Sequence, residues 1–256
     1  MNQAVVQNDE LSDRLVAALR QDEFVLYGQA IVPLAPSENQ RPFQEILIRF
    51  QEEEAKLLPP GSFFPILEEF GLMHYVDRWV VNRIAKWVRY ALTIKPDWLV
   101  PQNSINLSTL TLSDSRFAEY TCRQLHAAAL PLGTMSFEIT CDGAREHVDE
   151  LRGLMAQLRP AGCAFVLARF DGGKAALELA RQLKPEYVKF SPALVRILDR
   201  SSAGRYQVDA VNRECQALGV KTIAEHVESN QTRERLRELG VNFGQGFGIK
   251  VPARLG

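Results

Sequence analysis

The sequence predicts an α/β fold, and a closed (β/α)₈ barrel fits it best. Short β-rich runs alternate with longer stretches of helical period along the whole 256 residues. Roughly eight strand candidates follow this rhythm, as a barrel of this length requires. Gly162, Gly219 and Gly240 fit the turns that lead from a helix into the next strand. A doubly wound open sheet is the competing architecture that the same pattern allows.

The N-terminal part of the chain supplies two strands and a long helix. Apolar residues recur at helical spacing over 11–19, behind Asp9 or Ser12 as a cap. Strands are expected over 24–32 and 43–50. The stretch 59–98 predicts a short helix and then a long one, whose apolar face comprises Val76, Trp79, Val80, Ile84, Trp87 and Val88. We expect residues 1–10 to be a linker stub or a disordered N-terminus, and 11–256 to form one domain.

The rest of the chain continues the alternation. Strands are expected over 104–107, 135–139, 163–167, 187–190 and 220–224, with a last one near Asn242. Helices are expected around 115–129, 144–158, 174–183, 205–217 and 230–239.

Composition excludes several classes of function. Thirty basic and thirty-one acidic residues give a formal net charge of −1, so no basic excess favours capture of nucleic acid. The four cysteines form no C-x-x-C pair, which favours reduced thiols in a cytoplasmic protein. No apolar run approaches the roughly 20 residues that span a bilayer. We therefore expect neither a nucleic-acid partner nor membrane insertion.

Polar residues near the ends of the predicted strands are the candidates for a site, because barrels carry their chemistry at the carboxyl ends of the strands. One such residue alone would more often be a capped turn or a surface group. Seven that converge on one barrel mouth predict a ligand site: Glu45, Asn106, Glu138, Arg169, Lys189, Glu225 and Gln245.

These residues and their neighbours resemble the EAL domain family of cyclic-di-GMP phosphodiesterases, from about Leu11 to Pro252. The signature tripeptide appears as Glu45-Ile46-Leu47, followed by Arg49. Further blocks similar to the family's pattern lie at 27–34, 60–68, 77–80, 106–108, 137–140, 224–228 and 244–247.

The chain also departs from that pattern. Active members carry two adjacent aspartates in a D-D-F-G-T-G motif, and both serve a two-metal centre. Here Ala168 and Arg169 take their places. Four further family positions are altered, at Ala30, Cys141, Ser191 and His226. Losing two carboxylates and gaining a cation disfavours a pair of divalent ions, so we expect no metal, no cofactor and no enzymatic activity. A metal site relocated to Asp171 is the alternative.

The resemblance implies that the nucleotide pocket is retained although the catalytic centre is lost. Arg49 would give phosphate a charge-assisted fork, Asp77 and Glu225 would accept hydrogen bonds from guanine, and phenylalanines would stack on the bases. Arg169 either contacts a phosphate in place of a metal or is a surface charge. The expected pocket is Gln29, Leu47, Arg49, Phe50, Ser62, Phe64, Asp77, Asn106, Glu225, His226, Gly246, Phe247 and Pro252, with Glu45, Asn106, Glu138, Lys189, Glu225 and Gln245 as catalytic vestiges.

Three functions follow from the resemblance. The first is an inactive receptor of the FimX type, which binds cyclic di-GMP and a PilZ-domain adaptor to control type IV pili. The second is an interaction module without nucleotide binding, and the third is a residual phosphodiesterase. Because family dimers form near the altered D-D-F-G-T-G loop, a monomer is the expected state.

Overall fold

The computed structural model describes residues 14–19, 21, 23–35, 40–51, 57–58 and 60–255. The predicted N-terminal segment 1–10 lies outside these ranges. Residues 14–19 are helical, within the helix expected over 11–19. Within the described ranges, none of the helices combines the length and apolar character that crossing a lipid bilayer requires.

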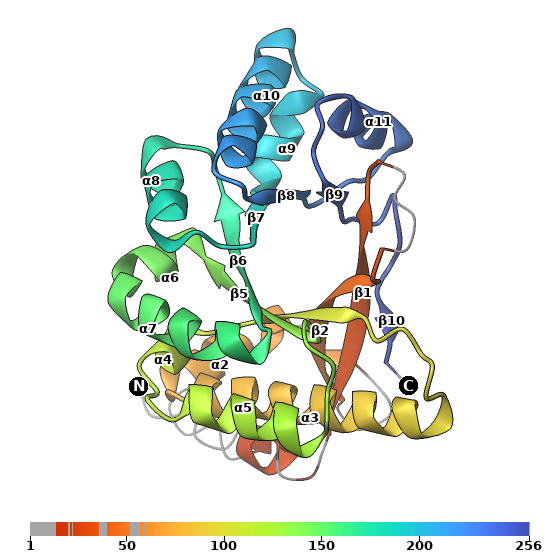
Figure 1. Ribbon diagram of the computed structural model, residues 1–256, viewed down its shortest axis with the longest axis vertical. Helices are drawn as coiled ribbons and strands as arrows, with labels where there is room; N and C mark the ends of the chain where they lie inside the picture. Colours follow the sequence, from red (N-terminus) through yellow and green to blue (C-terminus); the bar gives the residue numbers. More distant parts are fainter. Residues whose placement is uncertain are drawn as a thin grey trace, which may run out of the picture.

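Eight strands close into the predicted barrel (Figure 1). Around the ring, each strand pairs with the next, and β1 pairs with β2 to close it. All pairings in the ring are parallel except those of β1, which runs antiparallel to β2 and β9. The closed ring excludes the open sheet. In ring order the strands are β1 (Phe24–Pro33), β9 (Phe243–Gly244), β8 (Lys221–Ala224), β7 (Tyr187–Phe190), β6 (Ala164–Phe170), β5 (Met135–Thr140), β4 (Gln102–Asn106) and β2 (Phe43–Gln51).

Two short strands extend the ring on its outer side: β3 (Leu57–Leu58) pairs with β2, and β10 (Ala253–Arg254) with β1. The helices surround the strands in Figure 1. They are α2 (Phe64–Glu69), α3 (Met73–Ile94), α4 (Thr109–Leu112), α5 (Phe117–Ala127), α6 (Cys141–Glu146), α7 (Val148–Leu158), α8 (Lys174–Leu183), α9 (Pro192–Leu198), α10 (Ser202–Ala217) and α11 (Asn230–Glu238), with 3₁₀ turns at Pro60–Ser62 and Arg159–Ala161.

The helices differ from the prediction in three places, one of which is the short helix α4, which was not expected. The single helix expected over 144–158 is two helices, because His147 leaves the helical backbone (φ −133°, ψ 44°) and Thr140 caps a separate α6. Helix α9 was not expected at all. Its start does carry a sequence signal, since the Ser191 side chain accepts a hydrogen bond from the Leu194 amide and Pro192 occupies the first turn.

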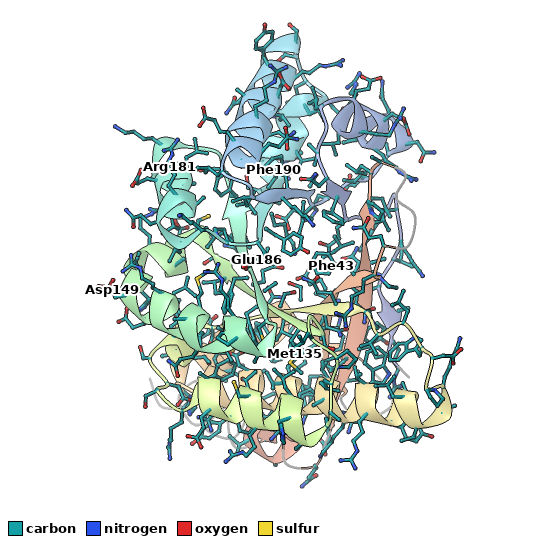
Figure 2. The ribbon with its side chains drawn as sticks, in the orientation of Figure 1. Phe43, Met135, Asp149, Arg181, Glu186 and Phe190 are labelled. Atoms are coloured by element: carbon teal, nitrogen blue, oxygen red, sulfur yellow. The ribbon has the colours of Figure 1, made fainter. Side chains whose placement is uncertain are left out.

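The interior of the barrel is built in two layers. The lower layer is apolar and comprises Ile31, Phe43, Val166, Ile223 and Phe243, with Tyr187 packed against it. Figure 2 shows Phe43 inside the ring, whereas Asp149 and Arg181 point outward from the helices.

Side chains two residues apart on a strand point to the same face. The strands therefore place a second set of residues directly above the lower layer. Most of this upper layer is polar: Gln29, Glu45, Lys189, Glu225 and Gln245. On β6 the equivalent position, two residues beyond Val166, is Ala168.

Candidate functional site

Lys189 is the centre of the upper layer. Its ammonium lies 3.0 Å from Oε2 of Glu45 and 2.7 and 2.6 Å from the two carboxylate oxygens of Glu138. The side chain is 1% exposed. Burial alone would lower the pKa of Lys189, but Glu138 and Glu45 outweigh it and raise that pKa above its ordinary value. The ammonium is therefore charged and fully engaged by the two carboxylates.

Amide side chains extend this network. Asn106 donates a hydrogen bond to Oε1 of Glu45 at 2.8 Å. Gln245 donates to Oε2 of Glu45 at 2.6 Å and to Oε1 of Gln29 at 3.1 Å. Burial would raise the pKa of Glu45, but Lys189 and these hydrogen bonds hold it below its ordinary value. Five of the seven residues predicted to converge thus contact one another. Glu45, Glu138 and Lys189 lie within their strands, however, and not at the strand ends.

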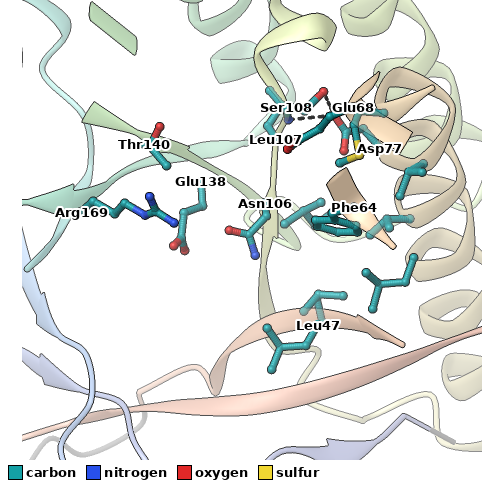
Figure 3. Close-up of a pocket in the computed structure, with 16 residues that line it drawn as sticks. Leu47, Phe64, Glu68, Asp77, Asn106, Leu107, Ser108, Glu138, Thr140 and Arg169 are labelled. Atoms are coloured by element: carbon teal, nitrogen blue, oxygen red, sulfur yellow. Dashed lines mark hydrogen bonds between the residues drawn. The ribbon is translucent and has the colours of Figure 1, made fainter. Parts of the chain in front are cut away.

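A hollow of about 270 Å³ opens beside the network, between the barrel and helices α2 and α3 (Figure 3). We call it the main hollow. Asp77 of α3 lies in its wall, and Oδ2 of Asp77 accepts hydrogen bonds from the Ser108 amide (2.9 Å), the Ser108 hydroxyl (2.8 Å) and Thr111 (2.6 Å). Burial raises the pKa of Asp77 to about 6, although these hydrogen bonds oppose the shift. Other lining residues include Leu47, Phe64, Asn106, Glu138 and Arg169.

A second hollow, of about 370 Å³, lies on the other side of Glu45. We call it the side hollow. Its wall carries Phe247, which is 70% exposed, and Glu225, whose pKa burial raises. Gln245 also lines it, and its Oε1 is buried with no hydrogen-bond partner among the described residues. The remaining lining residues are Gln29, Glu45, His226, Glu228 and Gly246.

Two residues at the mouth have left-handed backbones although they are not glycines: Arg169 (φ 53°) and His226 (φ 56°). Such a conformation is uncommon for residues with a Cβ and is found at ligand-binding sites. In the family pattern that the sequence resembles, a glycine stands at the position of His226, and the left-handed backbone gives the physical reason why glycine suits it.

The two hollows gather nine of the predicted pocket residues. Leu47, Phe64, Asp77 and Asn106 line the main hollow, and Gln29, Glu225, His226, Gly246 and Phe247 line the side hollow. Four others lie outside both: Arg49, Phe50, Ser62 and Pro252.

Two of these four have evident structural roles. Phe50 is 2% exposed and packs against Phe24 and Phe63, because alternate residues of β2 face away from the mouth. Arg49 donates to the Ile48 carbonyl at 2.8 Å, and its guanidinium lies 5.8 Å from the ring centroid of Tyr27.

The prediction missed several polar lining residues. Ser108 and Thr140 line the main hollow, and Ser104 donates to Oε2 of Glu138 at 3.3 Å. The signal for Ser104 was available, because it precedes Asn106 by two residues on the same strand.

The two-metal centre that the resemblance implies can be tested against these side chains. The carboxylates of Glu45 and Glu138 already form ion pairs with the Lys189 ammonium. Ala168 offers no oxygen ligand, and Arg169 adds a positive charge. Within the described ranges, no group of three or more His, Cys, Asp or Glu side chains is placed to hold a metal ion. The donor set therefore does not fit a pair of divalent ions.

Comparison with known proteins places this site in context. A model of the EAL domain family matches residues 12–252. The cyclic di-GMP phosphodiesterase PdeB of Shewanella oneidensis is 31% identical over 242 residues, which are 94% of this chain and 28% of that protein. The Escherichia coli cyclic di-GMP phosphodiesterase PdeF is 25% identical over 245 residues, which are 96% of this chain and 32% of that protein. The chain thus spans about a third of the length of these relatives.

The solved structures agree on the fold. The FimX EAL domain of Xanthomonas citri, in complex with c-di-GMP, matches with a TM-score of 0.90 at 19% identity, covering 99% of this chain and 97% of that one.

The curated relatives correct one prediction. The expectation that the chain is not an enzyme is wrong, because the relatives matching more than nine-tenths of it are named cyclic di-GMP phosphodiesterases. That expectation gave decisive weight to two adjacent positions, Ala168 and Arg169. Five other predicted residues of the mouth, Glu45, Asn106, Glu138, Lys189 and Gln245, still meet in one network.

Proposed function

Because this chain belongs to the EAL domain family, we propose that it binds cyclic di-GMP at the mouth of its barrel. One observation carries the proposal: two hollows flank a single polar network, and each offers a carboxylate and an aromatic ring. A dinucleotide has two bases joined through phosphates, so its outline matches two sites on either side of one centre. The bound c-di-GMP of the FimX domain, whose fold this chain shares, supports the choice of ligand.

In the main hollow, guanine would meet Asp77 and Phe64. All hydrogen bonds to Asp77 within the described residues go to Oδ2, which leaves Oδ1 for the N–H groups of the base. Phe64 lines the same hollow.

In the side hollow, Glu225 would accept hydrogen bonds from the second guanine, and Phe247 would lie against its ring. Phe247 is exposed before any ligand binds, so a stacked base would cover apolar surface at little reorganisation cost. Stacking of this kind contributes about 1–3 kcal/mol per base.

Calorimetric titration of the 256-residue chain with cyclic di-GMP tests the proposal. Phe247→Ala should weaken binding at least tenfold. Tyr206→Ala is the matched control, because Tyr206 is 79% exposed on α10, outside both hollows. Binding in EDTA should equal binding without it, since Lys189 already neutralises part of the network. Absence of binding at high micromolar nucleotide would refute the proposal.

Hydrolysis of cyclic di-GMP is a second candidate, favoured by the names of the curated relatives. The residues for it would be those of the network, with Glu45 in contact with Asn106, Lys189 and Gln245. The assay is formation of linear pGpG in the presence of Mg²⁺ or Mn²⁺. Product that disappears in Glu45→Ala would support this candidate, and no product from a chain that binds the nucleotide would contradict it.

We further propose that the bound state is passed to a protein partner, with a PilZ-domain adaptor of type IV pilus control as the candidate. The resemblance to FimX-type domains supports this proposal. A cytoplasmic location, a monomeric state and a domain that comprises 11–256 are proposed with it. A pull-down with the purified adaptor, with and without cyclic di-GMP, tests the partner. Equal capture in both would contradict a nucleotide-dependent relay.

A further inference from the structure

The wall of the main hollow carries negative charges that would repel an anionic ligand. Glu138, Asp77 and Glu68 are in its wall. The Lys189 ammonium, the buried cation nearest to it, is engaged by Glu138 and Glu45 at 2.6–3.0 Å. A phosphodiester that enters the hollow therefore needs another cation to offset these carboxylates.

Arg49 does not fill this need in the structure. Its guanidinium donates to the Ile48 carbonyl and lies beside the Tyr27 ring, outside both hollows. The family resemblance therefore pointed to a cation that the fold holds away from the main hollow.

Arg169 has the required place. Of the described side chains that line the main hollow, it is the one cation, and its guanidinium makes no hydrogen bond or ion pair within the part of the chain that the structure describes. Figure 3 shows the guanidinium extending into the hollow toward Glu138. Burial raises the pKa of Glu225, and the charge of Arg169 is one of several that oppose this rise, which places the guanidinium near the side hollow as well.

The backbone explains how β6 presents this side chain. The pairing of β6 with β7 shifts register between Leu167 and Phe170, and Arg169 has a left-handed φ of 53° within that shift. A bulge with a left-handed residue turns one side chain out of the regular alternation. Ala168 keeps the inward position above Val166, so the bulge brings Arg169 to the mouth in addition to the regular upper layer.

We propose that Arg169 binds a phosphate oxygen of the nucleotide in the main hollow; this assignment rests on the proposed function. A guanidinium suits the task, because it stays charged at all physiological pH values and forms paired hydrogen bonds with two oxygens of one phosphate. The bulge on β6 thus supplies a fixed positive charge at the position where the family's pattern carries an aspartate.

Three variants separate charge from backbone. Arg169→Gly removes the cation and adopts a left-handed backbone freely, so it should fold at least as well as the parent. Arg169→Lys retains the charge but loses the paired geometry. Lys174→Ala removes an exposed cation five residues along, outside both hollows. Each is titrated with cyclic di-GMP by calorimetry at low and at high salt, and melting curves verify folding.

Arg169→Gly should raise Kd at least tenfold with no loss in Tm, and the lysine variant should fall between it and the parent. The affinity of the parent should also decrease more steeply with salt than that of Arg169→Gly. If the parent and Lys174→Ala bind but Arg169→Gly binds equally well, the assignment to Arg169 is wrong and the proposed function stands. If the parent binds no cyclic di-GMP, both are wrong.

Discussion

Replacing Lys189 with methionine would remove the buried ammonium that holds the mouth together. Its Nζ contacts Glu45 at 3.0 Å and both oxygens of Glu138, and the side chain is 1% exposed. Methionine fills a similar volume without the charge. The variant would therefore leave two buried carboxylates facing each other without a counter-charge.

The magnitude follows from that imbalance. Breaking a buried ion pair by removing one partner costs about 3–5 kcal/mol, because the remaining charge is left unpaired. In a chain of this size about 1 kcal/mol changes Tm by roughly 2–4 °C. Lys189→Met should therefore lower Tm by about 10 °C at pH 7.5.

The loss should also depend on pH. In the parent protein the pKa of Lys189 is raised, so its stabilisation is fully present below the ordinary lysine pKa and is lost only above it. In Lys189→Met the pKa values of Glu45 and Glu138 rise, because burial and mutual repulsion favour their protonated forms. The variant should therefore recover stability as the pH falls from 8 to 5. Burial already raises the pKa of Glu138 to about 7 in the parent, so the parent should also gain stability over this range, but by less than the variant.

Thermal melting monitored by circular dichroism at several pH values measures both effects. Lys174→Met, at an exposed site, is the matched control. Adding Glu138→Gln to Lys189→Met removes one unpaired carboxylate and should restore part of the lost Tm. A variant that melts within 2 °C of the parent at pH 7.5 would refute the claim that Lys189 neutralises both carboxylates.

Three further substitutions test other features of the site. Burial raises the pKa of Asp77 to about 6 from 3.8, so its contribution to stability is greatest at low pH and falls as the pH rises from about 4 to 6. The free energy of unfolding of Asp77→Asn should therefore increase relative to that of the parent by up to about 3 kcal/mol between pH 4 and pH 7. Urea unfolding at several pH values measures this difference. Gly246→Ala should cost about 1–3 kcal/mol, because its Cβ would overlap the Val227 backbone; Gly61→Ala, whose Cβ would meet nothing within 4 Å, is the control, and equal melting of the two would contradict this. His226→Gly should keep or raise Tm, because glycine adopts its φ of 56° without the roughly 1 kcal/mol that other residues expend; a marked fall in Tm would show instead that imidazole packing holds this loop.

Much of the mouth could be predicted because the strands follow a simple rule. Phe43 and Glu45, or Tyr187 and Lys189, show an apolar residue followed two positions later by a polar one. That alternation is visible in a single sequence, and the closed barrel converts it into two stacked layers. Glu225 and Gln245 were predicted for the same reason, as the polar residues directly beyond β8 and β9.

Other features depend on backbone geometry that composition does not reveal. The bulge at Arg169 leaves no sequence signal, since arginine rarely adopts a left-handed backbone. The place of Phe50 in the core depends on which face of β2 packs against Phe24 and Phe63. The break at His147 is likewise a matter of backbone angles, which the continuous apolar period of 144–158 concealed.

The two layers of the barrel have a consequence for how such a domain changes over time. On β6, Val166 belongs to the apolar layer that closes the barrel, and Ala168 lies one pleat above it, level with the polar residues of the mouth. A substitution at the upper position leaves the packing below it intact, so ligand chemistry can be exchanged without refolding the scaffold. An uncharged polar side chain at position 168 should therefore cost the fold less than a charge at Val166, which would be buried in the apolar layer without a partner.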